Sequence, residues 1–205
     1  MNKEIFRKIP KGIILLIVLI LLAVIGFGIL FFVDRPVRLP AEFLTARQKG
    51  AEISQKIVEL TADTNQRIKE INALDINGDV LKAMAMIEEA KGKNREALDQ
   101  ALNLTGEMQD MAESLNKITL SKSREIAIKA IALEISLTTT FIVEYNPILD
   151  QFLSNLYKAI ATSKIEYRKA AENNLSDLNA KTWAINSLNR QFLEQMREFD
   201  KSFSL

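Results

Sequence analysis

The scarcity of helix-breaking residues constrains the fold of this chain more than any other feature. No proline lies between Pro40 and Pro147, and only four glycines follow residue 33. Proline removes a backbone donor and collides with the preceding helical turn, and glycine costs a helix about 1 kcal/mol relative to alanine. A stretch of this length that avoids both residue types, and that shows no alternating strand pattern, predicts long helices.

Three short segments interrupt the helical pattern. Asp75 to Asp79 contains turn residues, Ile118 to Ser123 contains capping hydroxyls, and Ser163 to Glu166 has the spacing of a capping box with Ser163 at the N-cap. Near-equal lengths joined by short turns predict an all-α fold, in which an antiparallel up-down-up-down four-helix bundle occupies residues 41–205. The helices are expected at about 41–74, 79–117, 122–161 and 164–203.

Apolar residues recur in each expected helix at alternating spacings of three and four, as a helix that faces a core requires. Because this series continues past Pro147 without a shift, we expect Pro147 to kink the third helix, although Asn146 is a point at which the helix could break instead. The series in the third helix consists of Ile128, Ile131, Ile135, Thr138, Ile142, Tyr145, Leu149, Phe152, Leu156 and Ala159.

The segment 12–33 is far more apolar than a helix of a soluble domain. Its 22 residues include no charged residue and no hydroxyl. A helix of this length spans about 33 Å, enough to cross a hydrocarbon core about 30 Å thick. The segment is longer than the apolar core of a signal peptide, and no A-x-A cleavage site follows it. We therefore expect an uncleaved transmembrane helix, followed by a stiff linker at 34–40 that contains Pro36 and Pro40.

Basic residues flank the expected span unevenly. The tail 1–11 contains four basic residues, whereas the linker contains two. This bias predicts a single-pass protein of the plasma (inner) membrane, with a cytoplasmic N-terminus and a periplasmic or extracellular bundle. The tail is also expected to contact anionic lipid of the bilayer. Its basic residues are Lys3, Arg7, Lys8 and Lys11.

The net charge of +1 hides two regions of opposite sign. Residues 1–33 carry a net charge of +3, and the remaining residues carry a net charge of −2. The basic excess is therefore a topology signal, and the bundle lacks the basic stripe that nucleic-acid binding requires. We expect no nucleic-acid partner.

The absence of cysteine and histidine excludes several kinds of chemistry. Zinc sites built on these residues, thiol redox chemistry, and Ser-His-Asp or Cys-His catalysis cannot occur. A di-iron site of the ferritin type also needs histidine. The acidic residues form no isolated pair with catalytic support. We therefore expect no catalytic residue, no metal site and no cofactor, and we do not expect an enzyme.

Polar residues interrupt the apolar series near the middle of the expected bundle. They predict a pocket for a small ligand. Alternatively, the lysines extend outward to solvent, the threonine hydroxyls bond back to their own helix, and the interruptions specify the register of the helices. The candidate pocket residues are Asn94, Thr138, Thr139, Tyr145 and Lys181.

Two functional hypotheses follow. An anchor, a bundle and no catalytic residues favour an adaptor or scaffold of a cell-envelope complex, which would bind protein partners or form a homo-oligomer. The alternative is an extracytoplasmic sensor or carrier module that binds a ligand through the mid-bundle polar residues. No motif assigns the chain to a family.

Overall fold

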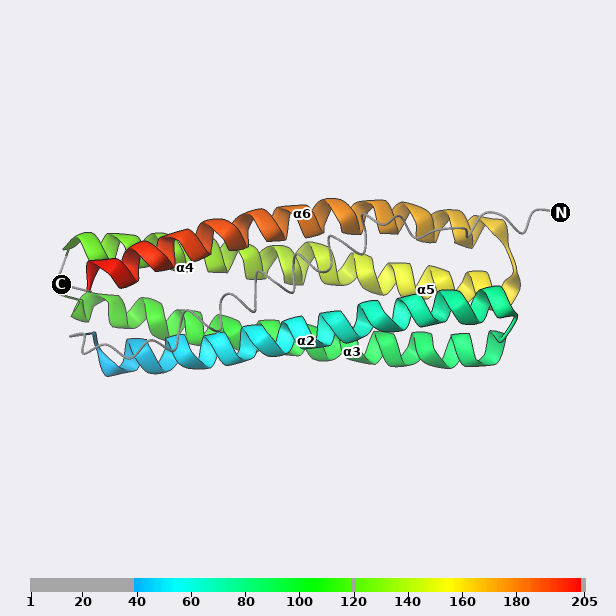
Figure 1. Cartoon of the computed structure of the whole chain (residues 1–205), viewed down its shortest axis with the longest axis horizontal. Coiled ribbons are helices and arrows are strands. Elements are labelled where there is room, and N and C mark those ends of the chain that lie inside the picture. The colour runs from blue at the N-terminus through cyan, green and yellow to red at the C-terminus, as the bar shows by residue number, and fades with distance from the viewer. Residues whose placement is uncertain (1–38, 119–120, 204–205) are drawn as a thin grey trace.

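The computed structural model describes residues 39–118 and 121–203, in which every regular element is a helix (Figure 1). Because α4, η2 and α5 follow one another without a gap, these residues form four long helices, and the predicted all-α fold is confirmed for them. The predicted transmembrane helix 12–33 and its basic tail 1–11 lie outside the described residues. The elements are α2 (Ala41–Asn77), α3 (Val80–Ser114), the 3₁₀ helix η1 (Leu115–Lys117), α4 (Ser121–Thr140), the π-helix η2 (Phe141–Tyr145), α5 (Asn146–Thr162) and α6 (Ile165–Ser202).

Long helices that follow one another in the chain run in opposite directions, side by side (Figure 1). The first and the last, α2 and α6, are joined at both ends. Arg168 near the start of α6 binds Asp75 near the end of α2, with 2.9 Å between Nη1 and Oδ2. Arg47 near the start of α2 binds Asp200 near the end of α6, with 2.8 Å between Nη1 and Oδ1. The four helices therefore enclose one long core.

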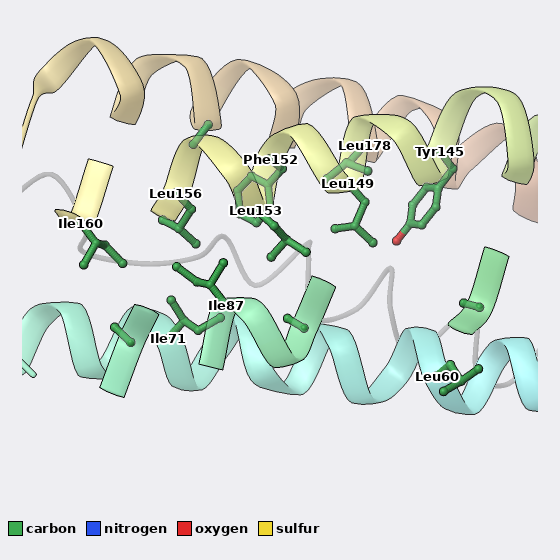
Figure 2. Close-up of a cluster of buried hydrophobic side chains, with 14 of the residues drawn as sticks. Leu60, Ile71, Ile87, Tyr145, Leu149, Phe152, Leu153, Leu156, Ile160 and Leu178 are labelled. Atoms are coloured by element: carbon green, nitrogen blue, oxygen red, sulfur yellow. The ribbon is translucent and has the colours of Figure 1, made fainter. Parts of the chain in front are cut away.

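One half of this core is built around α5. Leu149, Leu153 and Leu156 project from α5 toward Ile71 of α2 and Ile87 of α3 (Figure 2). All five side chains are at most 7% exposed. Their burial removes apolar surface from water, which is the main favourable term in folding.

A second apolar cluster fills the other half of the core. Phe43 of α2 packs against Phe199 of α6, with 5.4 Å between ring centroids, and the Arg47 guanidinium lies 5.8 Å from the centroid of the Phe199 ring. Phe43 and Phe199 are 1% and 0% exposed. The core of the bundle therefore contains two clusters of buried apolar residues.

Pro147 does not end the third long helix. The π-helix Phe141–Tyr145 lies directly before Asn146, and α5 then continues to Thr162. A π turn is wider than an α-helical turn and accommodates one more residue. The helix thus passes Pro147 without a break, as predicted.

The inward face of α4 differs from the predicted one. Ile128 and Ile135, which belong to the predicted apolar series, are 51% and 47% exposed. Ala127, Ala130 and Glu134 are buried instead. Ile131 and Thr138 of the same series are buried, so the structure agrees with the predicted face of α4 in part and differs at Ile128 and Ile135.

The turns between helices agree with the sequence at one place and differ at another. Gly78 ends α2 in the left-handed conformation, with φ of 80°, which glycine adopts without a steric penalty. Ser163 also has a positive φ, of 56°, and its N–H donates to the Ala159 carbonyl at 2.9 Å. Ser163 therefore ends α5, and Lys164 is the N-cap of α6. The predicted capping box between Ser163 and Glu166 is wrong.

The helix Lys122–Thr162 is, within the described ranges, long and apolar enough to cross a membrane by length and composition alone. Its most apolar window has a mean hydropathy of 1.8, and a third of that window is buried inside the bundle. Glu134 lies on its buried face, and Lys129 forms an ion pair with Glu125 at 2.9 Å. In this structure the helix packs as a core helix of the bundle.

Candidate functional site

A cavity of about 80 Å³ lies between the two apolar clusters, and all four long helices contribute to its wall. Most of the wall is carbon, supplied by residues such as Ile57, Leu104 and Phe141. A second cavity, of about 20 Å³, lies beside it and shares Leu104 and Glu134 with it. The polar residues of the larger cavity are Ser54, Thr61, Glu134, Thr138, Tyr145, Asn186 and Asn189.

Two hydroxyl groups at the larger cavity have no hydrogen-bond partner within residues 39–118 and 121–203. Thr138 is 2% exposed, and its Oγ1 atom is buried without a partner, as is Oγ of Ser54. Other threonines in the bundle satisfy this need locally: Thr64 and Thr182 donate to carbonyls of the preceding turn at 2.9 and 2.7 Å. The alternative that all core threonines bond back to their own helix therefore does not hold for Thr138.

Glu134 places a carboxyl group at both cavities. It is 8% exposed, and no basic side chain in the described part of the chain lies within ion-pair distance of it. Burial without a nearby positive charge raises the pKa of Glu134 to about 7. The carboxyl group therefore changes its charge near neutral pH.

The other charged residues at the cavities already have partners. Arg47, at the smaller cavity, binds Asp200 with both terminal nitrogens at 2.8 and 3.0 Å. Glu107, at the same smaller cavity, lies 3.8 Å from Lys49, while its Oε2 atom is buried and accepts no hydrogen bond. Among the charged residues of these two cavities, Glu134 thus differs in forming no ion pair with the described residues. Over the ranges that the structure describes, no group of three or more acidic residues could hold a metal ion.

Tyr145 contributes a phenol to the larger cavity. The Tyr145 side chain points from its helix toward α2 and α3, and its hydroxyl is the end nearest to them (Figure 2). Burial raises the pKa of Tyr145 to about 12, so the hydroxyl stays protonated at neutral pH. Its ring stacks on Phe141 at 5.5 Å between centroids, and these two residues begin and end the π-helix. Single π turns are frequent at functional sites.

Asn94, a predicted pocket residue, lines neither cavity. Its Nδ2 donates to the Asn146 carbonyl at 3.2 Å, and Asn146 Nδ2 donates to Oδ1 and to the carbonyl oxygen of Asn94 at 2.8 and 2.9 Å. Both residues are buried. This reciprocal pair joins α3 to the start of α5, which is the register role that the alternative interpretation assigned to polar residues in the core.

Two further predicted pocket residues face solvent. Thr139 is exposed. Lys181 is partly exposed and forms an ion pair with Glu144 on the outside of the bundle. Of the five predicted residues, the structure therefore brings Thr138 and Tyr145 to one cavity. The structure also places Glu134 and Ser54 at this cavity, and sequence reasoning missed both residues. In the sequence, Glu134 could have been found as an acidic residue one helical turn before Thr138.

Comparisons with protein-family models, with curated proteins and with solved structures each find no match for this chain.

Proposed function

We propose that this protein is a membrane-anchored helical bundle that binds a small molecule in the cavity between its four helices. One observation carries the proposal: the Thr138 and Ser54 hydroxyls line a cavity without a hydrogen-bond partner among the described residues, beside the Glu134 carboxyl, which forms no ion pair with them. Leaving a buried polar group unsatisfied costs about 1–3 kcal/mol. A molecule that supplies the missing partner recovers this energy when it binds.

The size of the cavity limits the molecule. An engineered cavity of about 150 Å³ holds benzene, and a single water needs about 10–15 Å³. The cavity of about 80 Å³ therefore suits a molecule of a few non-hydrogen atoms. Its mainly carbon wall favours an apolar body, and its few polar groups favour one polar end.

The proposed location follows from the sequence. Segment 12–33 is the proposed anchor, and the basic tail 1–11 is proposed to remain in the cytoplasm. The bundle and its cavity would then face the periplasm or the exterior. Single cysteines at Asn2 and Ser204, treated with an impermeant maleimide in intact cells, test this orientation without interference from native thiols. Labelling at position 2 alone would reverse the topology.

Filling the cavity tests the binding proposal. Ala101 lines the cavity and is 1% exposed, whereas Ala132 is exposed on the outside of α4. The full chain in detergent is screened against small metabolites by thermal shift. Compounds that stabilise the wild type should still stabilise Ala132→Leu and should lose their effect on Ala101→Leu. Equal stabilisation of both variants would place binding elsewhere and reject the proposal.

A second candidate function, an adaptor for protein partners, is favoured by an exposed apolar face. Ile128, Ile135 and Val143 are 51%, 47% and 64% exposed and recur at spacings of seven and eight along one helix. Exposed apolar faces of this kind are common at protein interfaces. A photo-crosslinker at Ile135, compared in intact membranes with one at the exposed Arg190, should give a discrete product that Ile128→Lys abolishes. Identical products at both positions would reject this candidate.

A further inference from the structure

We infer that the cavity binds a small organic cation, a short primary alkylamine whose ammonium group pairs with Glu134. This inference rests on the proposed ligand-binding function and names the chemical class of the ligand.

The charges at the two cavities favour a cation. Arg47 is engaged by Asp200, and Glu107 lies near Lys49. An ionised Glu134 is left with no opposite charge within ion-pair distance in the described part of the chain. An anionic ligand would be repelled by this carboxylate, and a neutral ligand would leave its charge uncompensated. A cation pairs with this carboxylate and thereby offsets the free-energy penalty of burying an unpaired charge.

The unpaired polar groups match the donors of an ammonium. A primary ammonium offers three N–H donors. Glu134 and Thr138 are four residues apart and thus lie on one face of α4, and Ser54 faces the same cavity from α2. The carboxylate of Glu134 and the unpartnered hydroxyls of Thr138 and Ser54 supply three acceptors. A primary ammonium therefore has one donor for each of the three groups that line this cavity, whereas a water molecule has two donors.

The remaining wall suits a short hydrocarbon tail. Phe141 and Tyr145 contribute two stacked aromatic rings, and Ile57 and Leu104 contribute aliphatic surface. Aromatic rings attract cations through the negative charge of their faces, by about 0.5–2 kcal/mol. A volume of about 80 Å³ accommodates a tail of a few carbons and excludes a long or branched amine.

The protonation states of the two partners predict the pH dependence of binding. The pKa of Glu134 is about 7, and an alkylamine resembles the lysine side chain, whose pKa is about 10.4. The titratable groups that face Glu134 across the cavities are Arg47, Glu107 and Tyr145, and Tyr145 stays neutral over this range. Affinity for the amine should therefore rise about tenfold between pH 6 and pH 8, as Glu134 ionises.

Isothermal titration calorimetry of the full chain in detergent tests this inference. The probes are n-butylamine, n-butanol and butyrate, which share a carbon chain of similar size and differ in charge. Glu134→Gln keeps the size of the side chain and removes its charge, and Glu144→Gln is the matched control because Glu144 lies outside the cavity and pairs with Lys181. We expect n-butylamine to bind at pH 8 at least tenfold more tightly than n-butanol. Glu134→Gln should remove this preference and Glu144→Gln should keep it.

Three outcomes would overturn the inference, and they separate it from the proposed function. If n-butanol binds as tightly as n-butylamine and Glu134→Gln changes neither, the cavity binds a ligand but not a cation. If potassium chloride at equal concentration displaces the amine completely, the site is selective for an inorganic cation. If no probe binds and no metabolite stabilises the protein, both the inference and the proposed function fail. Thr138→Val provides a second variant, which should weaken amine binding several-fold while its circular dichroism matches the wild type.

Discussion

Two polar interruptions of the same core have opposite hydrogen-bonding states. In the Asn94–Asn146 pair, the two buried amides bind each other and each other's carbonyl oxygens. At the cavity, the Thr138 hydroxyl is buried without a hydrogen-bond partner among the described residues, and the buried Glu134 forms no ion pair with them. Sequence spacing does not distinguish these cases, since all of these residues occupy core positions of long helices. A buried polar residue whose hydrogen bonds remain unmade is therefore a candidate for ligand binding, whereas one whose hydrogen bonds are made within the core has a structural role.

The clearest way to separate the two regions is their response to pH. Because the pKa of Glu134 is about 7 in the folded chain and the ordinary pKa of a glutamate is 4.5, the unfolded chain releases this proton at lower pH than the folded chain does. Stability is therefore lost as pH rises from about 4.5 to about 7, and the loss from this group is on the order of 3 kcal/mol. Urea denaturation of the full chain at several pH values, compared with Glu134→Gln, measures this loss.

The variant Glu134→Gln should lack this component of the pH dependence. The Asn94–Asn146 pair should contribute nothing to it, because side-chain amides do not titrate. Glu144→Gln again serves as the control, since its side chain is partly exposed and ion-paired. If wild type and Glu134→Gln lose stability in parallel between pH 4.5 and 7, Glu134 titrates as a solvated acid and the description of the cavity is wrong.

Breaking the asparagine pair is expected to have the next largest effect. Asn94→Leu leaves the buried amide of Asn146 without its partner, which should cost about 2 kcal/mol of the free energy of unfolding. The double variant Asn94→Leu/Asn146→Leu removes both polar groups and should recover part of this loss, so the two effects should not add. Denaturation of the four proteins of this cycle measures the coupling. Strict additivity would mean that the pair contributes no specific interaction.

Removing the unpartnered hydroxyl should have the opposite sign and a smaller size. Thr138→Val replaces a buried hydroxyl that has no hydrogen bond, so we expect a gain of about 1 kcal/mol in thermal or urea denaturation. Thr182→Val is the matched control, because the Thr182 hydroxyl donates to the Leu178 carbonyl at 2.7 Å. That substitution should stabilise the protein less than Thr138→Val does. A loss of stability in Thr138→Val would show that the hydroxyl has a partner in solution.

The four-helix organisation was predictable because it depends on residue types that act locally. Proline and glycine disfavour helices through local effects, so the absence of proline between Pro40 and Pro147 and the small number of glycines there indicate helices without reference to the rest of the chain. The turn at Gly78 was predictable for the same reason. The mistaken cap at Ser163 shows the limit of this reasoning, since a serine can end one helix as readily as it begins the next.

The buried face of α4 was not predictable, because this helix carries apolar residues on two faces. Ile128 and Ile135 are larger and more apolar than Ala127 and Ala130, so periodicity alone favours the face that the structure exposes.

The site residues were predictable in part for a related reason. Thr138 and Tyr145 belong to the predicted apolar series, are buried in the structure, and both line the cavity. Asn94 also occupies a core position, but its partner Asn146 is 52 residues away in the chain. Whether a buried polar group finds such a distant partner depends on the packing of two helices, which no local pattern encodes.

The smallest expected effect lies at the predicted pocket residues that face solvent. Lys181→Ala breaks an ion pair with Glu144 in which both side chains are more than a third exposed, and such pairs contribute about 0.5 kcal/mol or less. The same variant should leave n-butylamine binding unchanged, because Lys181 does not line the cavity. Calorimetry and urea denaturation of Lys181→Ala, measured beside Glu134→Gln, therefore compare a charge on the surface with a charge in the core. A loss of amine affinity in Lys181→Ala as large as that in Glu134→Gln would mean that the binding site lies on the outside of the bundle, around the Glu144–Lys181 pair, and not between its helices.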